Sequence, residues 1–101
     1  MSEAPEFDEV FAAAATLGRE LFGSTPAGQA RKLQEEAGEW ADAPGDLEEM
    51  ADCLLALVIG VAASGHTADD LLEAARAKIA LCRRRKWVET EAGVFRHVKE
   101  G

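Results

Sequence analysis

Four acidic residues between positions 32 and 52 have the types and spacing to hold a divalent cation. The stretch reads KLQEEAGEWADAPGDLEEMAD, and its acids form two pairs, Glu36 with Glu39 and Glu49 with Asp52. Residues three apart lie on one face of a helix, so the two carboxylates of each pair can point the same way. Carboxylate oxygens are the ligands that Mg²⁺ and Mn²⁺ prefer, and both ions also bind phosphates. The spacing indicates a metal site, although two solvated acidic helix faces would look the same.

The apolar residues around these acids predict that the carboxylates turn inward. On the first helix Glu36 falls beside the apolar stripe, Glu39 lies at its edge and Glu35 points largely away; the stripe is formed by Leu33, Ala37, Trp40 and Ala41. On the second helix Glu49 and Asp52 share a face with Ala56, Ile59 and Ala63. An unpaired carboxylate is costly inside a helical bundle. A cation, basic partners or shifted pKa values must offset that cost, which favours the metal site.

The elements that position these acids are predicted to be four helices. Apolar periodicity and breakers place them at residues 7–22, 27–42, 46–64 and 68–86, with Asp46 and Thr67 as N-caps and Gly65 ending the third. Residues 1–6 are expected to fray, and residues 87–101 to form an irregular tail that packs on the bundle or on a second subunit. The sequence therefore predicts an all-α fold, a four-helix bundle in a single domain spanning residues 1–101.

Composition narrows the range of partners. A net charge of −8 argues against broad nucleic-acid binding. The longest apolar run near the middle, residues 53–63, is too short to span a bilayer, so we expect no membrane contact. Cys53 and Cys82 both fall among apolar residues, which predicts reduced core thiols in a cytoplasmic protein. The third helix is apolar on two faces, more than one small bundle needs, and we interpret the excess as a subunit interface.

The acidic motifs resemble the signature of the MazG-like all-alpha nucleoside triphosphate pyrophosphohydrolases. EExxE stands here as residues 35–39 and ExxD as residues 49–52, and the similarity runs from about Arg31 to Lys99. The segments DLEEMAD (46–52), AK…CRRRKW (77–87) and GVFRHVK (93–99) are similar to one branch, the phage-type dATP/dGTP diphosphohydrolases (MazZ). One departure is the connection between Glu39 and Glu49, which at nine residues is shorter than in many relatives.

The resemblance implies a metal-dependent enzyme. It implies Mg²⁺ or Mn²⁺ held by Glu36, Glu39, Glu49 and Asp52, attack of water on the α-phosphorus, and a homodimer or homotetramer. The expected catalytic residues are Glu35, Glu36 and Glu39, with Glu35 as a base behind the metal ligands, although its outward angle argues against a direct role. If the chain is phage-encoded, its location would be the host cytoplasm.

Three residues of the C-terminal third are candidates for substrate binding. Lys78 and Arg85 lie in or beside the apolar stripe of the fourth helix, where their stems can either extend to water or reach a triphosphate. Trp87, like Trp40, can stack on a base or pack in the core. One or two aromatic residues at the edge of the first helix can also wall a base pocket.

The predicted function is hydrolysis of a purine deoxynucleoside triphosphate, with dGTP first and dATP second, to the monophosphate and pyrophosphate. The choice of base comes from the resemblance alone. Two alternatives stay open. One is a pyrophosphohydrolase for another nucleotide, such as dUTP, dCTP or a general house-cleaning range. The other is a non-enzymatic helical oligomer that uses the basic run 83–86 as a nucleic-acid accessory.

Overall fold

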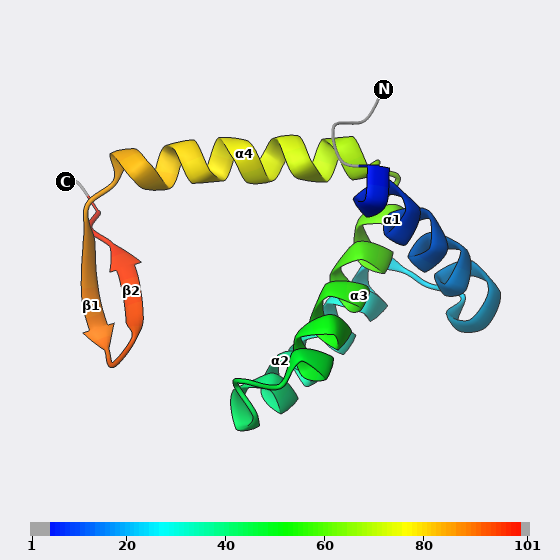
Figure 1. The fold of residues 1–101 in the computed structure, drawn as a ribbon, viewed down its shortest axis with the longest axis horizontal. Helices are drawn as coiled ribbons and strands as arrows, with labels where there is room; N and C mark the ends of the chain where they lie inside the picture. The colour runs from blue at the N-terminus through cyan, green and yellow to red at the C-terminus, as the bar shows by residue number, and fades with distance from the viewer. Residues whose placement is uncertain (1–4, 100–101) are drawn as a thin grey trace. The chain divides into compact units, whose positions relative to one another are not determined.

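The computed structural model describes residues 5–99, which are mostly helical (Figure 1). The helices are α1 (Pro5–Leu17), the π-helix η1 (Gly18–Phe22), α2 (Pro26–Asp42), α3 (Leu47–Ala63) and α4 (Ala68–Arg84), followed by strands β1 (Trp87–Glu91) and β2 (Val94–His97). The four predicted helices are confirmed to within two residues at their ends, with the last turn of the first one in π geometry. Residues 1–4 of the predicted frayed end, and the last two residues of the predicted tail, lie outside the described residues.

The chain comprises two compact units, one ending at Leu71 and the other beginning at Leu72. The first unit holds α1, η1, α2, α3 and the first turn of α4, and the second holds the rest of α4 and the two strands. The prediction of a single domain over residues 1–101 stays a prediction.

The helix ends form where the sequence places capping residues. Thr25 Oγ1 accepts a hydrogen bond from the Gly28 N–H at 3.0 Å, ahead of Pro26 in the first turn of α2. Asp46 Oδ1 accepts from the Glu48 N–H at 2.9 Å at the start of α3. Thr67 and Asp70 exchange side-chain and backbone bonds of 3.1 and 2.9 Å at the start of α4, the reciprocal capping box that their spacing predicts.

The π-helical turn η1 ends the first helix with one carbonyl that collects several donors. The Gly18 carbonyl accepts from the backbone N–H of Gly23, and from both the N–H and the hydroxyl of Ser24 at 3.4 and 3.2 Å. A Cβ on Gly18 would lie 2.6 Å from Ile59 Cγ2, so only glycine lets this turn approach α3 so closely. The turn thereby fixes the segment after it against α3.

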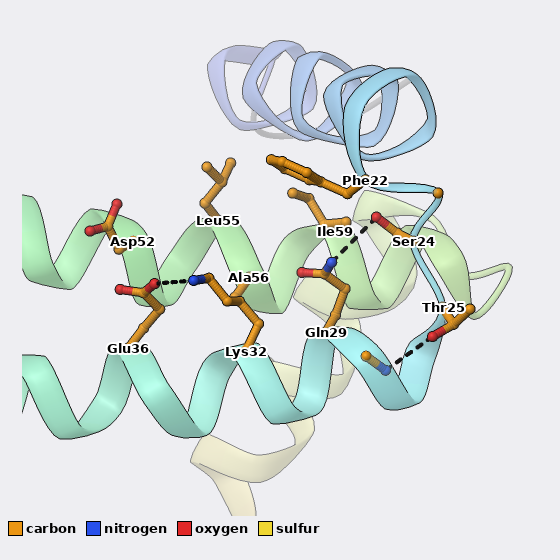
Figure 2. Close-up of a pocket in the computed structure, with 12 residues that line it drawn as sticks. Phe22, Ser24, Thr25, Gln29, Lys32, Glu36, Asp52, Leu55, Ala56 and Ile59 are labelled. Carbon is orange, nitrogen blue, oxygen red and sulfur yellow. Dashed lines mark hydrogen bonds and ion pairs between the residues drawn. The ribbon is translucent and has the colours of Figure 1, made fainter.

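The core of the first unit forms where α1 and the start of α4 meet α3. It consists of buried Phe11, Ala14, Val58, Ile59 and Ala68. Helices α2 and α3 lie side by side (Figures 1 and 2), and α1 packs chiefly against α3. Helix α3 is thus the element against which the other helices of this unit pack.

The C-terminal segment is a β-hairpin, so the prediction of an irregular tail without strands was wrong at residues 87–97. Strands β1 and β2 pair antiparallel, from Trp87 opposite His97 to Glu91 opposite Val94, with an irregularity between Glu89 and Glu91. Gly93 makes the tight turn at φ 76°, a conformation that favours glycine. A glycine between two short runs with β-branched residues is the signal for this hairpin, but strands of five and four residues carry little periodicity.

Within residues 5–99 no helix combines the length and the apolar character needed to cross a membrane. The cytoplasmic location stays a prediction.

Candidate active site

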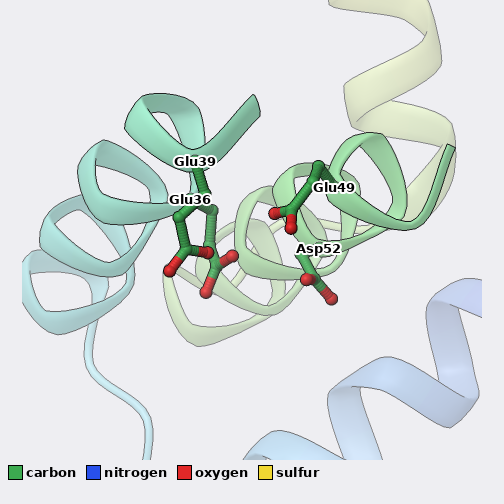
Figure 3. Close-up of side chains that lie close together, drawn as sticks. All are labelled: Glu36, Glu39, Glu49 and Asp52. Carbon is green, nitrogen blue, oxygen red and sulfur yellow. The ribbon is translucent and has the colours of Figure 1, made fainter. Parts of the chain in front are cut away.

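The four predicted acids converge in the first unit. Glu36 and Glu39 come from α2, Glu49 and Asp52 come from α3, and one carboxylate oxygen from each lies within 4.8 Å of the others. Figure 3 shows Glu49 pointing toward Glu36 and Glu39 on the neighbouring helix, with Asp52 on the same helix as Glu49. We call these four residues the acid cluster. The arrangement can hold a divalent cation, as the spacing predicts.

A short connection holds the two helices in this register. The Ala43 N–H bonds back to the carbonyls of Glu39 and Trp40, and the Asp46 N–H bonds to the Ala43 carbonyl at 2.9 Å. The Trp40 indole Nε1–H donates to the Pro44 carbonyl at 3.1 Å, across the same turn. Trp40 is thus tied to the connection between the helices, and its side chain is 42% exposed.

The acid cluster contains buried oxygens without hydrogen-bond partners. Glu36 is only 8% exposed, and both its Oε2 and the Oε2 of Glu49 are buried without a partner among the described residues. A buried, unpaired carboxylate oxygen is unfavourable, and such groups are usually satisfied by an ion or by water. The donor set consists entirely of carboxylates, which suits a hard cation such as Mg²⁺ or Mn²⁺.

The pKa values within the cluster shift as expected for carboxylates forced together. A hydrogen bond shared with Glu39, and a second from Lys32, lower the pKa of Glu36, whereas the same bond to Glu36 and the negative charge of Glu36 raise the pKa of Glu39. Burial, and next the charge of Asp52, raise the pKa of Glu49. The shifts of Glu39 and Glu49 show that the cluster without a cation disfavours full ionisation, a cost that a bound cation would relieve.

Lys32 contacts the acid cluster, and the sequence reasoning did not single it out. Its Nζ lies 3.2 Å from Glu36 Oε1 and 3.6 Å from Glu35 Oε2. The i, i+4 spacing to Glu36 was the available signal. Glu35 itself is 71% exposed and lies outside the acid cluster, in line with its predicted outward angle.

A cavity of about 500 Å³ adjoins the cluster, with Glu36 and Asp52 in its wall (Figure 2). Its apolar lining includes Phe22, Leu55 and Ile59, and its polar lining includes Gln29 and Lys32. This volume falls in the range of small-molecule sites. The cavity places room for an organic group directly beside the carboxylates. Phe22, at the edge of the first helix, is an aromatic residue of the kind predicted to wall a base pocket.

Comparison with known proteins identifies the family. Residues 11–101 match the family model for dATP/dGTP pyrophosphohydrolase. The chain belongs to the dATP/dGTP pyrophosphohydrolase family. This confirms the resemblance that the acidic motifs suggested, and it confirms that the chain is an enzyme.

Two relatives support the assignment of the chain to this family. A dATP/dGTP diphosphohydrolase of Cyanophage S-2L is 39% identical over 80 residues, which cover 72% of this chain and 69% of the relative. A solved structure of a Cyanophage S-2L MazG-like pyrophosphohydrolase, bound to dGDP and three catalytic Mn²⁺ ions per active site, matches with a TM-score of 0.69 and 31% identity. That match covers 98% of this chain and 100% of the other, and it confirms the all-α MazG-like fold.

The predicted substrate-binding residues belong to the second unit of the pyrophosphohydrolase. Lys78 is exposed on α4, and Arg85, just after α4, is half-buried, whereas its neighbours Arg84 and Lys86 are exposed. Trp87 opens β1, where its Nε1–H donates to the Cys82 carbonyl at 2.8 Å and its ring packs edge-on against His97. Their contact with substrate stays a prediction.

Proposed function

We propose that this enzyme hydrolyses dGTP and dATP to the deoxynucleoside monophosphate and pyrophosphate, with dGTP as the preferred substrate. The observation that carries the proposal is the acid cluster beside a cavity of about 500 Å³. Carboxylates that can hold cations suit a triphosphate, and the adjoining space suits a nucleoside. The family and the name of the Cyanophage S-2L diphosphohydrolase support the two purine nucleotides, and the dGDP bound in the solved structure supports guanine.

Glu36, Glu39, Glu49 and Asp52 would hold Mg²⁺ or Mn²⁺. The buried, partnerless oxygens of Glu36 and Glu49 fit this role, because a cation would satisfy both. When bound, such a metal neutralises phosphate charge and makes a water molecule more acidic. The protein contributes the fixed positions of four carboxylates, set by the short connection between α2 and α3.

Glu36 and Glu39 would act as catalytic residues by fixing the reacting phosphate and water through the metal site. Glu35 precedes Glu36 in α2, and Lys32 contacts both residues. Glu35 would act as a base that does not itself bind the metal.

Lys78 and Arg85 would contact the leaving pyrophosphate, and Trp87 would contact the base. Arg85 suits phosphate binding because a guanidinium can bind two oxygens at once. The half-buried position of Arg85 among exposed basic neighbours supports the choice of this arginine. These roles require that substrate reach the second unit.

The enzyme would act as a homodimer or homotetramer in the cytoplasm. The apolar residues Leu54 and Leu57 of α3 are 44% and 43% exposed, which supports the predicted subunit interface. The non-enzymatic alternative is set aside, because the family is one of enzymes. Another preferred nucleotide remains an outcome of the test.

The test is an assay of all common NTPs and dNTPs with Mg²⁺ or Mn²⁺ that resolves pyrophosphate from orthophosphate. We expect pyrophosphate as the product, the highest kcat/KM with dGTP, the next with dATP, and no activity after chelation. A higher kcat/KM with dUTP or dCTP would contradict the proposed substrate. Release of orthophosphate from the triphosphate would contradict the proposed bond cleavage.

A further inference from the structure

The polar wall of the cavity contains one amide whose orientation is set by its neighbours. Gln29 Nε2 donates to Ser24 Oγ at 3.3 Å, and the Ser24 hydroxyl donates to the Gly18 carbonyl at 3.2 Å. A hydroxyl has one proton to give. Because that proton is directed at Gly18, Ser24 can only accept from Gln29, and the Gln29 amide must turn its nitrogen toward Ser24.

The consequence is a carbonyl oxygen presented to the cavity. Figure 2 shows the Gln29 nitrogen facing Ser24 and the amide oxygen on the other side, toward the space between α2 and α3. Both Gln29 and Ser24 line the cavity. A hydrogen-bond acceptor of fixed orientation in an otherwise largely apolar cavity selects a ligand that offers a donor at that place.

The position of Gln29 along α2 matches the base end of a nucleotide. Gln29, Lys32 and Glu36 follow at spacings of three and four residues, share one face of α2 and all line the cavity. Seven residues of helix separate Gln29 from Glu36, a rise of about 10 Å. A nucleotide with its phosphates at the acid cluster would span that distance and bring its base to Gln29, in the part of the cavity that Phe22 and Ile59 also line.

We propose that Gln29 reads the donor edge of the purine base, and that Ser24 positions its amide for that contact. The inference rests on the proposed function, since it assumes a purine nucleotide with its phosphates at the acid cluster. Adenine offers its exocyclic amine as a donor, and guanine offers its ring N–H and its own amine. Because the adenine donor is at C6 and the guanine donors are at N1 and C2, one acceptor would serve both purines only if the two bases lie differently in the cavity.

The test compares two nucleotides on each enzyme variant. One is dATP, and the other is the 2′-deoxynucleoside triphosphate of unsubstituted purine, which has the same ring and no amine. We expect the wild-type enzyme with Mn²⁺ to show a kcat/KM about tenfold higher for dATP, the scale of one net hydrogen bond. The ratio within one variant cancels differences in folding and metal loading.

Gln29→Met keeps the Cβ that packs near Gly60 and removes the amide, and its ratio should fall close to one. Ser24→Ala lets the Gln29 amide rotate, so its ratio of kcat/KM values should lie between that of the wild type and that of Gln29→Met. The melting temperature of this variant checks that it is folded. The matched control is Gln34→Met, which changes an exposed glutamine of the same helix and should keep the wild-type ratio. Gln29→Leu replaces Gln29→Met if the latter fails to fold.

A wild-type ratio of one, or a wild-type ratio retained in Gln29→Met, would overturn the inference and leave the proposed function standing. Absence of hydrolysis of every purine deoxynucleoside triphosphate by the wild-type enzyme would instead overturn the proposed function, and the inference with it.

Discussion

The α2–α3 pair and the β1–β2 hairpin each consist of two neighbouring elements joined by a tight turn. They differ in whether their charged side chains are exposed and paired. In the hairpin, Arg96 contacts Thr90 and Glu91, the Glu89 carboxylate accepts from the Gly93 N–H, and these side chains are exposed. Between α2 and α3, by contrast, Glu36 and Glu49 each keep a buried oxygen that has no partner within residues 5–99.

The difference distinguishes charged side chains that need no ligand from those that favour one. Exposed, paired charges contribute little to stability and need no further ligand. A buried carboxylate oxygen without a partner is unfavourable for the protein alone, so the two oxygens of Glu36 and Glu49 favour a ligand that satisfies them. Substitutions and metal titrations can test whether the two regions differ in this way.

Neutralising the acid cluster should have the largest effect. Glu36→Gln, Glu39→Gln, Glu49→Gln and Asp52→Asn should each lower kcat/KM for dGTP with Mn²⁺ by at least about 100-fold, the scale of losing one electrostatic contact to the transition state. The matched controls are Glu48→Gln, an exposed acid beside Glu49, and Glu91→Gln in the hairpin. Near-normal activity in any of the four variants would remove that residue from the proposed ligands.

Removing cations of the second unit should have an intermediate effect. Lys78→Met and Arg85→Met keep the apolar stem and delete the charge, and each should lower kcat/KM by about tenfold or more if it contacts the leaving pyrophosphate. Arg84→Met, at an exposed position, should have a smaller effect. Metal affinity, followed by Mn²⁺ titration, should stay unchanged. Equal activity in the three variants would return Lys78 and Arg85 to a purely structural role.

The smallest expected effect is the rise in thermal stability of the protein when it binds metal. At pH 7, millimolar Mn²⁺ should raise the melting temperature by about 5 °C, because a ligand of the folded state stabilises it by mass action. Glu49→Gln should diminish this shift, and Glu91→Gln should preserve it. An unchanged melting temperature in the wild-type protein would contradict the metal site.

The pH dependence of this shift has a defined sign. The pKa values of Glu39 and Glu49 are raised in the folded protein, so the metal-free fold loses stability as pH rises from the ordinary Glu range through these raised values. The lowered pKa of Glu36 acts in a more acidic window, where stability is lost as pH falls. Because bound Mn²⁺ replaces the protons, its stabilising effect should grow as pH rises through the raised values. Thermal unfolding from pH 4 to pH 8, with and without Mn²⁺, measures both trends.

The acid cluster was predictable from sequence because its geometry is local. The two i, i+3 pairs are separated by only nine residues, from Glu39 to Glu49, and the Pro44–Gly45 break supplies the turn that brings them together once the helices pack. The helix ends were predictable for the same reason, since caps act within a few residues.

The cavity and the hairpin could not be predicted from the periodicity of apolar residues. The π turn exists through the approach of Gly18 to Ile59, which are far apart in sequence, and the orientation of Gln29 follows from that turn. Both strands of the hairpin are short and almost entirely exposed, so their sequences show little alternation of apolar and polar residues. Gly93 was the single strong signal for the hairpin. The substrate roles of Lys78, Arg85 and Trp87 remain predictions.

The π turn at Gly18–Phe22 also has a meaning for how the enzyme can change over evolution. A π turn accommodates about one residue more than an α turn, so η1 absorbs one extra residue of the first helix within a single turn. Deleting one residue there would remove the wide turn and reshape the segment that carries Phe22 and Ser24 to the cavity, whereas the sequences of α2 and α3, which carry the acids, would stay the same. Under the proposed function, a change of chain length at this point would act on the nucleoside side of the site and not on the carboxylates.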